Sequence, residues 1–294
     1  MNSVANCPED TANLLTTVNG VEAGLLSLAD RGLAYGHGLF ETMLFSVAVV
    51  PLWQRHSSRL INDAAVLGLN ISQASLDDNL RKFIDLLKRQ SQSSGIIKIM
   101  VTAGTGGRGY ASPANIAPQI ICQFSPLPTK LEQPRRDGVA LTQCQYSLPS
   151  NPLLAGIKHL NRLDQVLARA EWDNEYADGL MYSQEGMLVE TTCANIFVKT
   201  ADRGWITPKL DRAGVRGVMR GLLLEELFTR TGLTVSEGEI SRQQLAEATE
   251  LFICSSIRGL LPVTEVNDLG HWLIGTDTKM LQSALFDLYD CYPC

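Results

Sequence analysis

The sequence lacks any uninterrupted apolar stretch of the roughly 18 residues that a membrane-spanning helix needs. It also lacks a cluster of basic residues, since 25 Lys and Arg stand against 31 Asp and Glu, a net charge of −6. Without such a cluster, binding to a nucleic-acid backbone is not expected. Residues 1–10 contain acids, a proline and no apolar core, unlike a secretion signal. These absences favour a cytoplasmic protein that binds neither membranes nor nucleic acid.

Cysteine is sparse, and only one pair has the Cys-x-x-Cys spacing, Cys291 and Cys294 at the C-terminus. That pair is a candidate redox or metal couple, but no second pair or histidine cluster accompanies it. The seven cysteines form an odd set scattered along the chain. We therefore expect mostly reduced, buried thiols and no metal ion.

The composition is that of a folded protein, with 294 residues, 45% of them hydrophobic and 19% charged. This length suggests two domains. The proline-containing polar stretches around 125–137 favour a connector there. We predict a mixed α/β (α+β) protein with a smaller N-terminal domain (1–126, of which 1–13 form a flexible extension), a linker (127–137) and a larger C-terminal domain (138–294).

Periodicity predicts the elements of each domain. Asn19-Gly20 between two apolar runs is a strong hairpin signal. Apolar residues at three- and four-residue steps predict helices, and short β-branched runs predict strands. The predicted strands are 14–18, 21–28, 96–102, 119–124, 138–146, 179–183, 187–189 and 194–199, and the predicted helices are 54–67, 75–90, about 160–173, 215–231 and 278–290.

Two glycine-rich segments could approach a ligand closely. In Asp30–Thr42, glycines at 32, 36 and 38 allow tight turns that serve either a cofactor ring or packing alone. The segment Gly104–Tyr110 follows an apolar run but lacks the Gly-Lys-Ser/Thr of a phosphate loop. A substrate-side loop that contributes Arg108 is the better functional interpretation.

Three further segments carry charge at the edges of predicted elements. Lys158 precedes a predicted helix, and a desolvated lysine there would suit Schiff-base chemistry, whereas most lysines are simply solvated. Glu190 leads into an apolar strand and, if buried, needs a cationic partner such as a protonated heterocyclic nitrogen; the alternative is an acid in a solvated turn. Residues 214–220 open a helix whose N–H groups would attract a phosphate or merely be capped.

Together these segments resemble the fold-type IV pyridoxal-phosphate (PLP) enzymes, which include branched-chain and D-amino-acid aminotransferases and aminodeoxychorismate lyases. The lyases are the closest in pattern. The resemblance runs from about residue 18 to the C-terminal region and is most specific in Gly-Ile-Lys-His-Leu-Asn-Arg-Leu at 156–163. It is carried by residues 151–167, 106–110 and 213–220.

The resemblance implies a role for each matching residue. Lys158 matches the lysine that binds PLP covalently and moves protons, Glu190 the acid facing the pyridine nitrogen, and Arg59 the arginine that binds the phosphate; a surface arginine is the alternative. The rest of the phosphate site is implied at the backbone of Val218 and Met219 and the hydroxyl of Ser256.

The activity implied is a PLP-dependent lyase that converts 4-amino-4-deoxychorismate into 4-aminobenzoate and pyruvate in folate biosynthesis, in a homodimer. Charge complementarity makes Arg108 and Arg258 candidates for the two substrate carboxylates. His37 is a further candidate, although it stands where the family often has Asp, and Ala103 where an Arg is frequent. An aminotransferase of the same fold and a non-catalytic PLP-binding protein are the alternatives.

Overall fold

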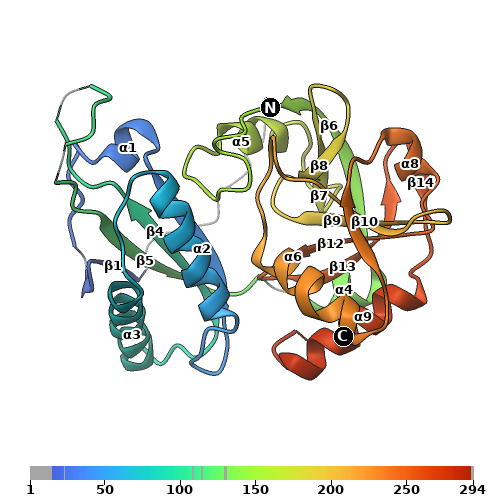
Figure 1. Cartoon of the computed structure of the whole chain (residues 1–294). Helices are drawn as coiled ribbons and strands as arrows, with labels where there is room; N and C mark the ends of the chain where they lie inside the picture. The colour runs from blue at the N-terminus through green and yellow to red at the C-terminus, as the bar shows by residue number, and fades with distance from the viewer. Residues whose placement is uncertain (1–14, 23, 108, 114, 129–130, 293–294) are drawn as a thin grey trace, which may run out of the picture. The chain divides into compact units, whose positions relative to one another are not determined.

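The computed structural model describes residues 15–22, 24–107, 109–113, 115–128 and 131–292, so the predicted extension at 1–13 lies outside the described residues. The backbone forms two compact units, Met1–Trp53 with Leu60–Leu127 and Gln54–Arg59 with Pro128–Cys294 (Figure 1). The second unit therefore takes in a short piece of the N-terminal half. The segment 132–137 differs from the linker expected there, because it forms helix α4 (Glu132–Asp137), in which Arg135 is buried.

The first unit contains an antiparallel sheet in the order β2-β1-β5-β4-β3. The Asn19-Gly20 hairpin is confirmed, with both residues at positive φ between β1 and β2. The predicted strand over 21–28 is wrong beyond Glu22, where pairing ends. The strands are β1 (Thr16–Val18), β2 (Val21–Glu22), β3 (Gly38–Phe45), β4 (Gly95–Thr102) and β5 (Gln119–Ser125).

Helices α2 (Trp53–Val66) and α3 (Gln73–Arg89) were both predicted within two residues of their ends. The side chain of Ser72 caps α3 by accepting the Ser75 N–H at 3.2 Å. Its apolar stripe is buried as the period of 3.6 requires, at Leu76, Leu80, Phe83, Leu86 and Leu87. A short helix, α1 (Arg31–Tyr35), precedes β3 and begins at Asp30, whose side chain accepts two backbone N–H groups.

The second unit is built on a mixed sheet in the order β11-β10-β9-β12-β13-β6-β7-β8, with β14 beside β13. Its two ends approach each other, since β8 contacts β9 and β10, so the sheet is curled. The strands are β6 (Val139–Leu148), β7 (Asp178–Ser183), β8 (Leu188–Thr191), β9 (Asn195–Thr200), β10 (Gly204–Pro208), β11 (Val235–Gly238), β12 (Glu250–Ser255), β13 (Gly259–Val266) and β14 (Gly270–His271).

Two of the helices predicted in this unit, at about 160–173 and 215–231, are longer than the helices found there. Residues 160–162 precede the first of these helices, which begins at Leu163, and residues 215–217 are not helical either, since the next helix begins at Val218. A π-helical segment (Leu223–Leu227) lies between α6 and α7. The helices are α5 (Leu163–Arg169), α6 (Val218–Leu222), α7 (Phe228–Arg230), α8 (Arg242–Ala246) and α9 (Thr276–Leu288).

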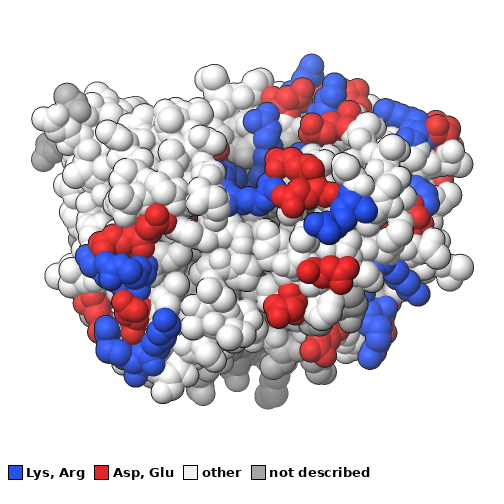
Figure 2. Space-filling view, turned by 60° about the horizontal axis from the view of Figure 1, so that its bottom comes forward, with Lys and Arg blue, Asp and Glu red and all other residues white. Residues whose placement is uncertain are grey.

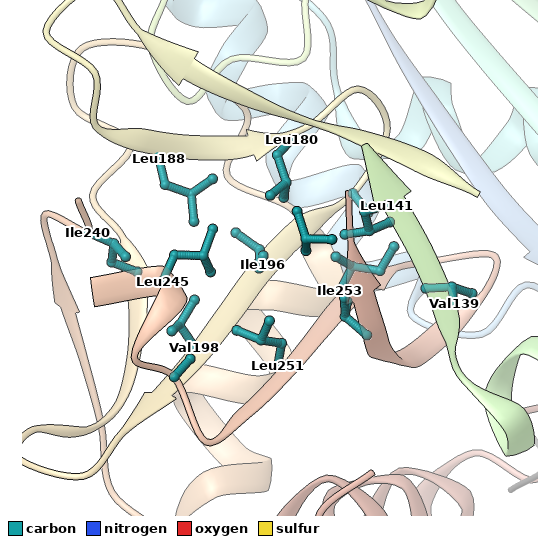
Figure 3. Packing of buried hydrophobic residues seen from close by; sticks show 14 of the residues in the cluster. Val139, Leu141, Leu180, Leu188, Ile196, Val198, Ile240, Leu245, Leu251 and Ile253 are labelled. Carbon is teal, nitrogen blue, oxygen red and sulfur yellow. The ribbon is translucent and has the colours of Figure 1, made fainter. Parts of the chain in front are cut away.

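The curled sheet encloses an apolar core. Figure 3 shows side chains from several strands directed toward one another, among them Leu180, Leu188, Ile196 and Ile253. Leu245 of α8 joins them and is wholly buried. A second cluster packs Ala168 of α5 and Trp172 against β6 and β7. Apolar clusters therefore pack on both faces of this sheet, since Leu180 of β7 belongs to the first cluster and the adjacent Met181 to the second.

A buried aromatic cluster contributes strongly to the stability of the second unit. The ring of Phe252 is fully buried, with its centroid 4.9 Å from that of Phe197 and 5.0 Å from that of Trp205. We expect Phe252→Ala to lower the free energy of unfolding by about 3–5 kcal/mol, because it removes apolar contacts and leaves a cavity. Denaturant unfolding would measure this, with the 41% exposed Phe286 of α9 as the control. Equal losses for Phe252→Ala and Phe286→Ala would contradict the prediction.

Charge on the surface is mixed in sign. On the face in Figure 2, Lys and Arg lie in small groups beside Asp and Glu. Among the helices within the described ranges, none has the length and apolarity to cross a membrane.

Candidate active site

The residues 214–217, here called the junction segment, bring several parts of the second unit together. Gly214 O accepts the Gly156 N–H at 2.9 Å, and Gly156 O accepts the Arg216 N–H at 3.0 Å. Gly214 has φ of 84°, and a Cβ there would lie 2.8 Å from Val189 Cγ1. Only glycine therefore permits this close approach to β8.

Glu190 of β8 is buried, 4% exposed, and bonded to the junction segment. Its Oε2 accepts the Val215 N–H at 2.9 Å. Burial raises the pKa of Glu190 from 4.5 to about 7, although the Val215 N–H and the charges of Arg162 and Lys158 act in the opposite direction. The interpretation of an acid in a solvated turn is therefore wrong, and Glu190 is a buried carboxyl that can gain or lose a proton near neutral pH.

Asn195, the first residue of β9, also binds the junction segment and was given no role from the sequence. Its Nδ2 donates to Val215 O at 2.9 Å, and its Oδ1 accepts the Gly217 N–H at 3.0 Å. Val215 is thus bound on both sides, by Glu190 and by Asn195. A partner twenty residues away leaves no periodic signal in the sequence.

Arg59 of α2 contacts the same segment. Its Nη1 donates to Arg216 O at 2.7 Å. One turn earlier, Arg55 forms ion pairs with Glu225 and Glu226. The bond from Arg59 to Arg216 O places its guanidinium beside Gly217, which directly precedes α6.

The start of α6 has the character of an anion site. Gly217 is its N-cap, and among the described residues no side chain caps it. The N–H groups of a first helical turn have no partner within the helix and attract negative charge. Val218 and Met219 are buried, 6% and 1% exposed.

Lys158 lies in the loop between β6 and α5 and is half-buried. The loop is attached to the junction segment through Gly156, two residues earlier. The charge of Lys158 acts on the carboxyl of Glu190 and on the thiol of Cys193. The three residues that carried the sequence argument, Lys158, Glu190 and Arg59, thus lie around one segment.

Ser256 and Arg258 lie in the turn between β12 and β13. Cys254 pairs with Asn195 across β12 and β9, so this turn is at the same edge of the sheet. Two residues not singled out in the sequence secure the turn: Tyr292 Oη donates to Ser256 O at 2.7 Å, and Arg135 Nε donates to Arg258 O at 2.8 Å.

His37 lies in the first unit, and its surroundings go against a role in binding substrate. Its Nδ1 accepts from Nε of the buried Arg31 at 3.3 Å, and its Nε2 is 3.0 Å from Leu67 O. With both ring nitrogens engaged, His37 has none to offer a carboxylate. Arg31 also donates to Tyr110 O at 2.8 Å and to Gly109 O at 3.1 Å.

Arg31, paired with His37, therefore holds the glycine-rich loop 104–110 through its bonds to Gly109 O and Tyr110 O. Gly106 of that loop must be glycine, since a Cβ would come within 2.5 Å of the Arg31 side chain. Arg108 lies outside the described residues. Ala103, where an arginine was noted as frequent, is buried and donates its N–H to His37 O at 2.9 Å.

Of the cysteines within the described ranges, Cys122, Cys144 and Cys254 are buried free thiols, whereas Cys193 is exposed and Cys291 half-buried. Cys294 lies outside those ranges. No group of three or more His, Cys, Asp or Glu side chains there is arranged to ligate a metal ion.

Comparison with known proteins places this arrangement in a family. Residues 38–266 match the family described as amino-transferase class IV. An aminodeoxychorismate lyase of Vibrio harveyi is 34% identical over 277 residues, 91% of this chain and 98% of that protein. A putative branched-chain-amino-acid aminotransferase of Methanocaldococcus jannaschii is 28% identical, over 90% of this chain and 91% of that one.

Among solved structures, the 4-amino-4-deoxychorismate lyase from Pseudomonas aeruginosa superimposes with a TM-score of 0.88 and 40% identity. The match covers 94% of this chain and 100% of the other. The expected mixed α/β, fold-type IV architecture is thereby confirmed. Family match, sequence identity and fold agree over most of the length, so the chain belongs to the class IV amino-transferase family.

Proposed function

We propose that this protein is a PLP-dependent lyase that converts 4-amino-4-deoxychorismate into 4-aminobenzoate and pyruvate, a step of folate biosynthesis. The observation that carries the proposal is the meeting of Glu190 and Arg59 at the junction segment, to which the Lys158 loop is also attached. The lyases of V. harveyi and P. aeruginosa, which match nearly end to end, support the lyase over the aminotransferase.

The chemistry of these side chains fits PLP. Lys158 offers an amine for the aldehyde, Glu190 a buried carboxyl for the ring nitrogen, and Arg59 a guanidinium for the phosphate. The uncapped start of α6 offers N–H groups of Val218 and Met219 to the same phosphate, and the hydroxyl of Ser256 is the remaining candidate. When bound, PLP supplies an electron sink for the carbon that carries the substrate amine.

Glu190 and Lys158 divide the proton chemistry between them. With PLP bound, the Glu190 carboxylate would keep a proton on the ring nitrogen, and this interaction would be strong because Glu190 is buried, 4% exposed. Lys158 Nζ binds the cofactor at rest. Once released as an amine, it removes the proton from the carbon next to the substrate nitrogen. Departure of the enolpyruvyl oxygen would then leave an aromatic ring, and the released enolpyruvate would take up a proton to become pyruvate. Lys158 would bind the cofactor again as 4-aminobenzoate leaves, and aromatisation would make the reaction irreversible.

Arg258 is our candidate for one substrate carboxylate, together with Arg108. The Arg258 carbonyl is held by Arg135, and the charge of Arg258 acts on the thiol of Cys193, three residues after Glu190. A guanidinium on a turn secured in this way suits a dicarboxylate substrate. His37 is not proposed for this role.

We also propose that the protein acts as a homodimer. The short helix α5 exposes apolar side chains at Leu163, Val166 and Leu167, and Leu153 is 81% exposed in the preceding loop. A patch of this kind is typical of an interaction surface. Light scattering at several protein concentrations would test it: a mass of one chain throughout would contradict the dimer.

The experiment that tests the function uses the purified protein loaded with PLP. It is incubated with 4-amino-4-deoxychorismate, and 4-aminobenzoate and pyruvate are quantified. A parallel reaction with amino acids and keto acids measures amine transfer. Equal amounts of the two products support the lyase; amine transfer without them moves the assignment to an aminotransferase, and PLP binding with neither activity to a non-catalytic protein.

A prediction concerns the proposed phosphate contact. Arg59→Ala is expected to weaken PLP binding about 10- to 100-fold, because charge-assisted hydrogen bonds to the phosphate are lost. Binding of pyridoxal, which lacks the phosphate, should change little. Equilibrium dialysis measures both, and Arg55→Ala on the same helix is the matched control. Equal weakening for PLP and pyridoxal would mean that Arg59 serves the fold rather than the phosphate.

A further inference from the structure

Asp178, the first residue of β7, is a buried carboxylate for which the proposed chemistry has no use. It is 1% exposed. Burying a charge is costly unless hydrogen bonds compensate. An apolar residue at this position would avoid the free-energy cost of desolvating a charge. The hydrogen bonds of Asp178 therefore indicate what the acid does.

Those hydrogen bonds go mainly to the turn that follows Glu190. Asp178 Oδ1 accepts from the N–H and Oγ1 of Thr192 at 3.1 and 2.6 Å. Its Oδ2 accepts from Thr191 Oγ1 at 2.8 Å and from Cys193 Sγ at 2.9 Å. The remaining bond, from Gly179 N at 2.9 Å, is local. One carboxylate therefore binds three consecutive residues of the turn.

The turn 191–194 connects Glu190 and Asn195, the two residues that hydrogen-bond to the junction segment. Glu190 precedes it and Asn195 follows it, and both bind Val215. Within the turn, Thr191 Oγ1 also accepts the Ala194 N–H at 2.9 Å. Because Asp178 fixes the turn, it fixes the distance between the carboxyl of Glu190 and the amide of Asn195.

Asp178 also acts through its charge. Burial is the main cause of the raised pKa of Glu190, about 7, and the negative charge of Asp178 adds to it, opposed by Arg162 and Lys158. Cys193 is exposed as a residue, but its Sγ lies 2.9 Å from Oδ2 of the buried Asp178, and the pKa of this thiol is raised to about 12, by desolvation first and by Asp178 next. The thiol therefore stays protonated and remains a donor to Asp178.

We propose that Asp178 is a positioning residue of the active site: through the Thr191–Cys193 turn it holds Glu190 and Asn195 on the junction segment. It does not itself touch the reacting atoms. The catalytic part of this inference rests on the proposed function, whereas the link between Asp178 and Glu190 does not.

The first test uses the apoprotein of Asp178→Asn. Infrared difference spectra across pH follow buried carboxyl groups, and Glu190→Gln identifies the band of Glu190. Removal of the Asp178 charge should lower the midpoint of that band, because the charge of Asp178 raises the pKa of Glu190. This readout requires neither substrate nor PLP, so it stands even if the protein is not a lyase.

The second test uses the PLP-loaded enzyme. Asp178→Asn should raise the dissociation constant of PLP about tenfold and lower kcat with a smaller change in KM, because the substrate does not contact Asp178. Asp178→Glu, which retains the charge, should keep the midpoint of Glu190 closer to that of the wild type. A folded Asp178→Asn protein with unchanged midpoint, PLP affinity and kcat would overturn the proposal.

Thr192→Val keeps the proposal testable if Asp178→Asn does not fold. It removes the 2.6 Å bond to Asp178 but leaves the carboxylate in place. PLP affinity should fall with little shift in the Glu190 midpoint. Thr249→Val, which removes a hydroxyl bonded to Lys199 O far along the chain, is the control. If Thr192→Val matches Thr249→Val in both readouts, the turn does not depend on Asp178 as proposed.

Discussion

Lys158→Ala is expected to reduce product formation by at least about 10³-fold, since proton transfer by a positioned group and covalent binding of the cofactor are both lost. The residue lies in a loop fixed to the junction segment and its charge acts on Glu190. The measurement is the initial rate with 4-amino-4-deoxychorismate, alongside the visible absorption band of lysine-bound PLP. The band should disappear in the variant.

Two further observations separate a catalytic lysine from a structural one. Borohydride reduction of the wild type should attach the cofactor to the peptide that contains Lys158, and mass spectrometry would locate it. Added methylamine should restore part of the activity of Lys158→Ala, because a free amine can replace Nζ. Lys209→Ala, at an exposed position after β10, is the control. An adduct on another lysine would contradict the assignment.

Glu190→Gln should lower kcat by about 10²- to 10³-fold, a loss typical of removing one preorganised electrostatic contact. Gln can still accept the Val215 N–H, so the 2.9 Å bond is retained. It cannot carry the negative charge that keeps a proton on the ring nitrogen. The rate of product formation and the PLP absorption spectrum measure the loss.

The same substitution, which lowers kcat, should increase the stability of the apoprotein at alkaline pH relative to its stability at acidic pH. The pKa of Glu190 is raised from 4.5 to about 7, so between these values the folded protein binds more protons than the unfolded chain. The contribution of Glu190 to stability therefore falls as the pH rises through this window and stays low above it. Glu190→Gln should remove this dependence.

Urea unfolding at pH 5 and pH 8 measures the difference. The difference in free energy of unfolding, Glu190→Gln minus wild type, should be more positive at pH 8 than at pH 5. A variant that loses stability equally at both pH values and keeps its kcat would show that Glu190 is a structural residue.

The elements that the sequence predicted well are those whose signal is local. Helix α3 shows its buried stripe in the spacing of Leu76, Leu80 and Phe83, and Asn19-Gly20 adopts the left-handed backbone that its hairpin needs. Strand β2 was overestimated, because Leu25 and Leu28 are apolar yet exposed. An apolar run predicts burial only where a neighbouring strand is present to pair with it.

The site was predictable to the extent that its residues form contiguous motifs. Lys158 and Glu190 belong to such motifs. Asp178, Asn195 and Arg135 do not, since each is a buried polar residue whose partners come from other elements. The bonds of His37 were likewise not visible in the sequence: it was a candidate for the substrate at a position where the family often has Asp, and its two ring nitrogens contact Arg31 and Leu67.

The small piece of chain at 54–59, which belongs to the second unit although the rest of α2 belongs to the first, limits how this protein can be divided. A fragment that begins at Pro128 retains Lys158 and Glu190 but loses the Arg59 guanidinium bonded to Arg216 O. Recombination or gene fission at the most evident boundary would thus separate the amine of the proposed cofactor site from its phosphate contact. If the proposed cofactor site is correct, a protein cut at this boundary would lose PLP affinity even where each piece folds.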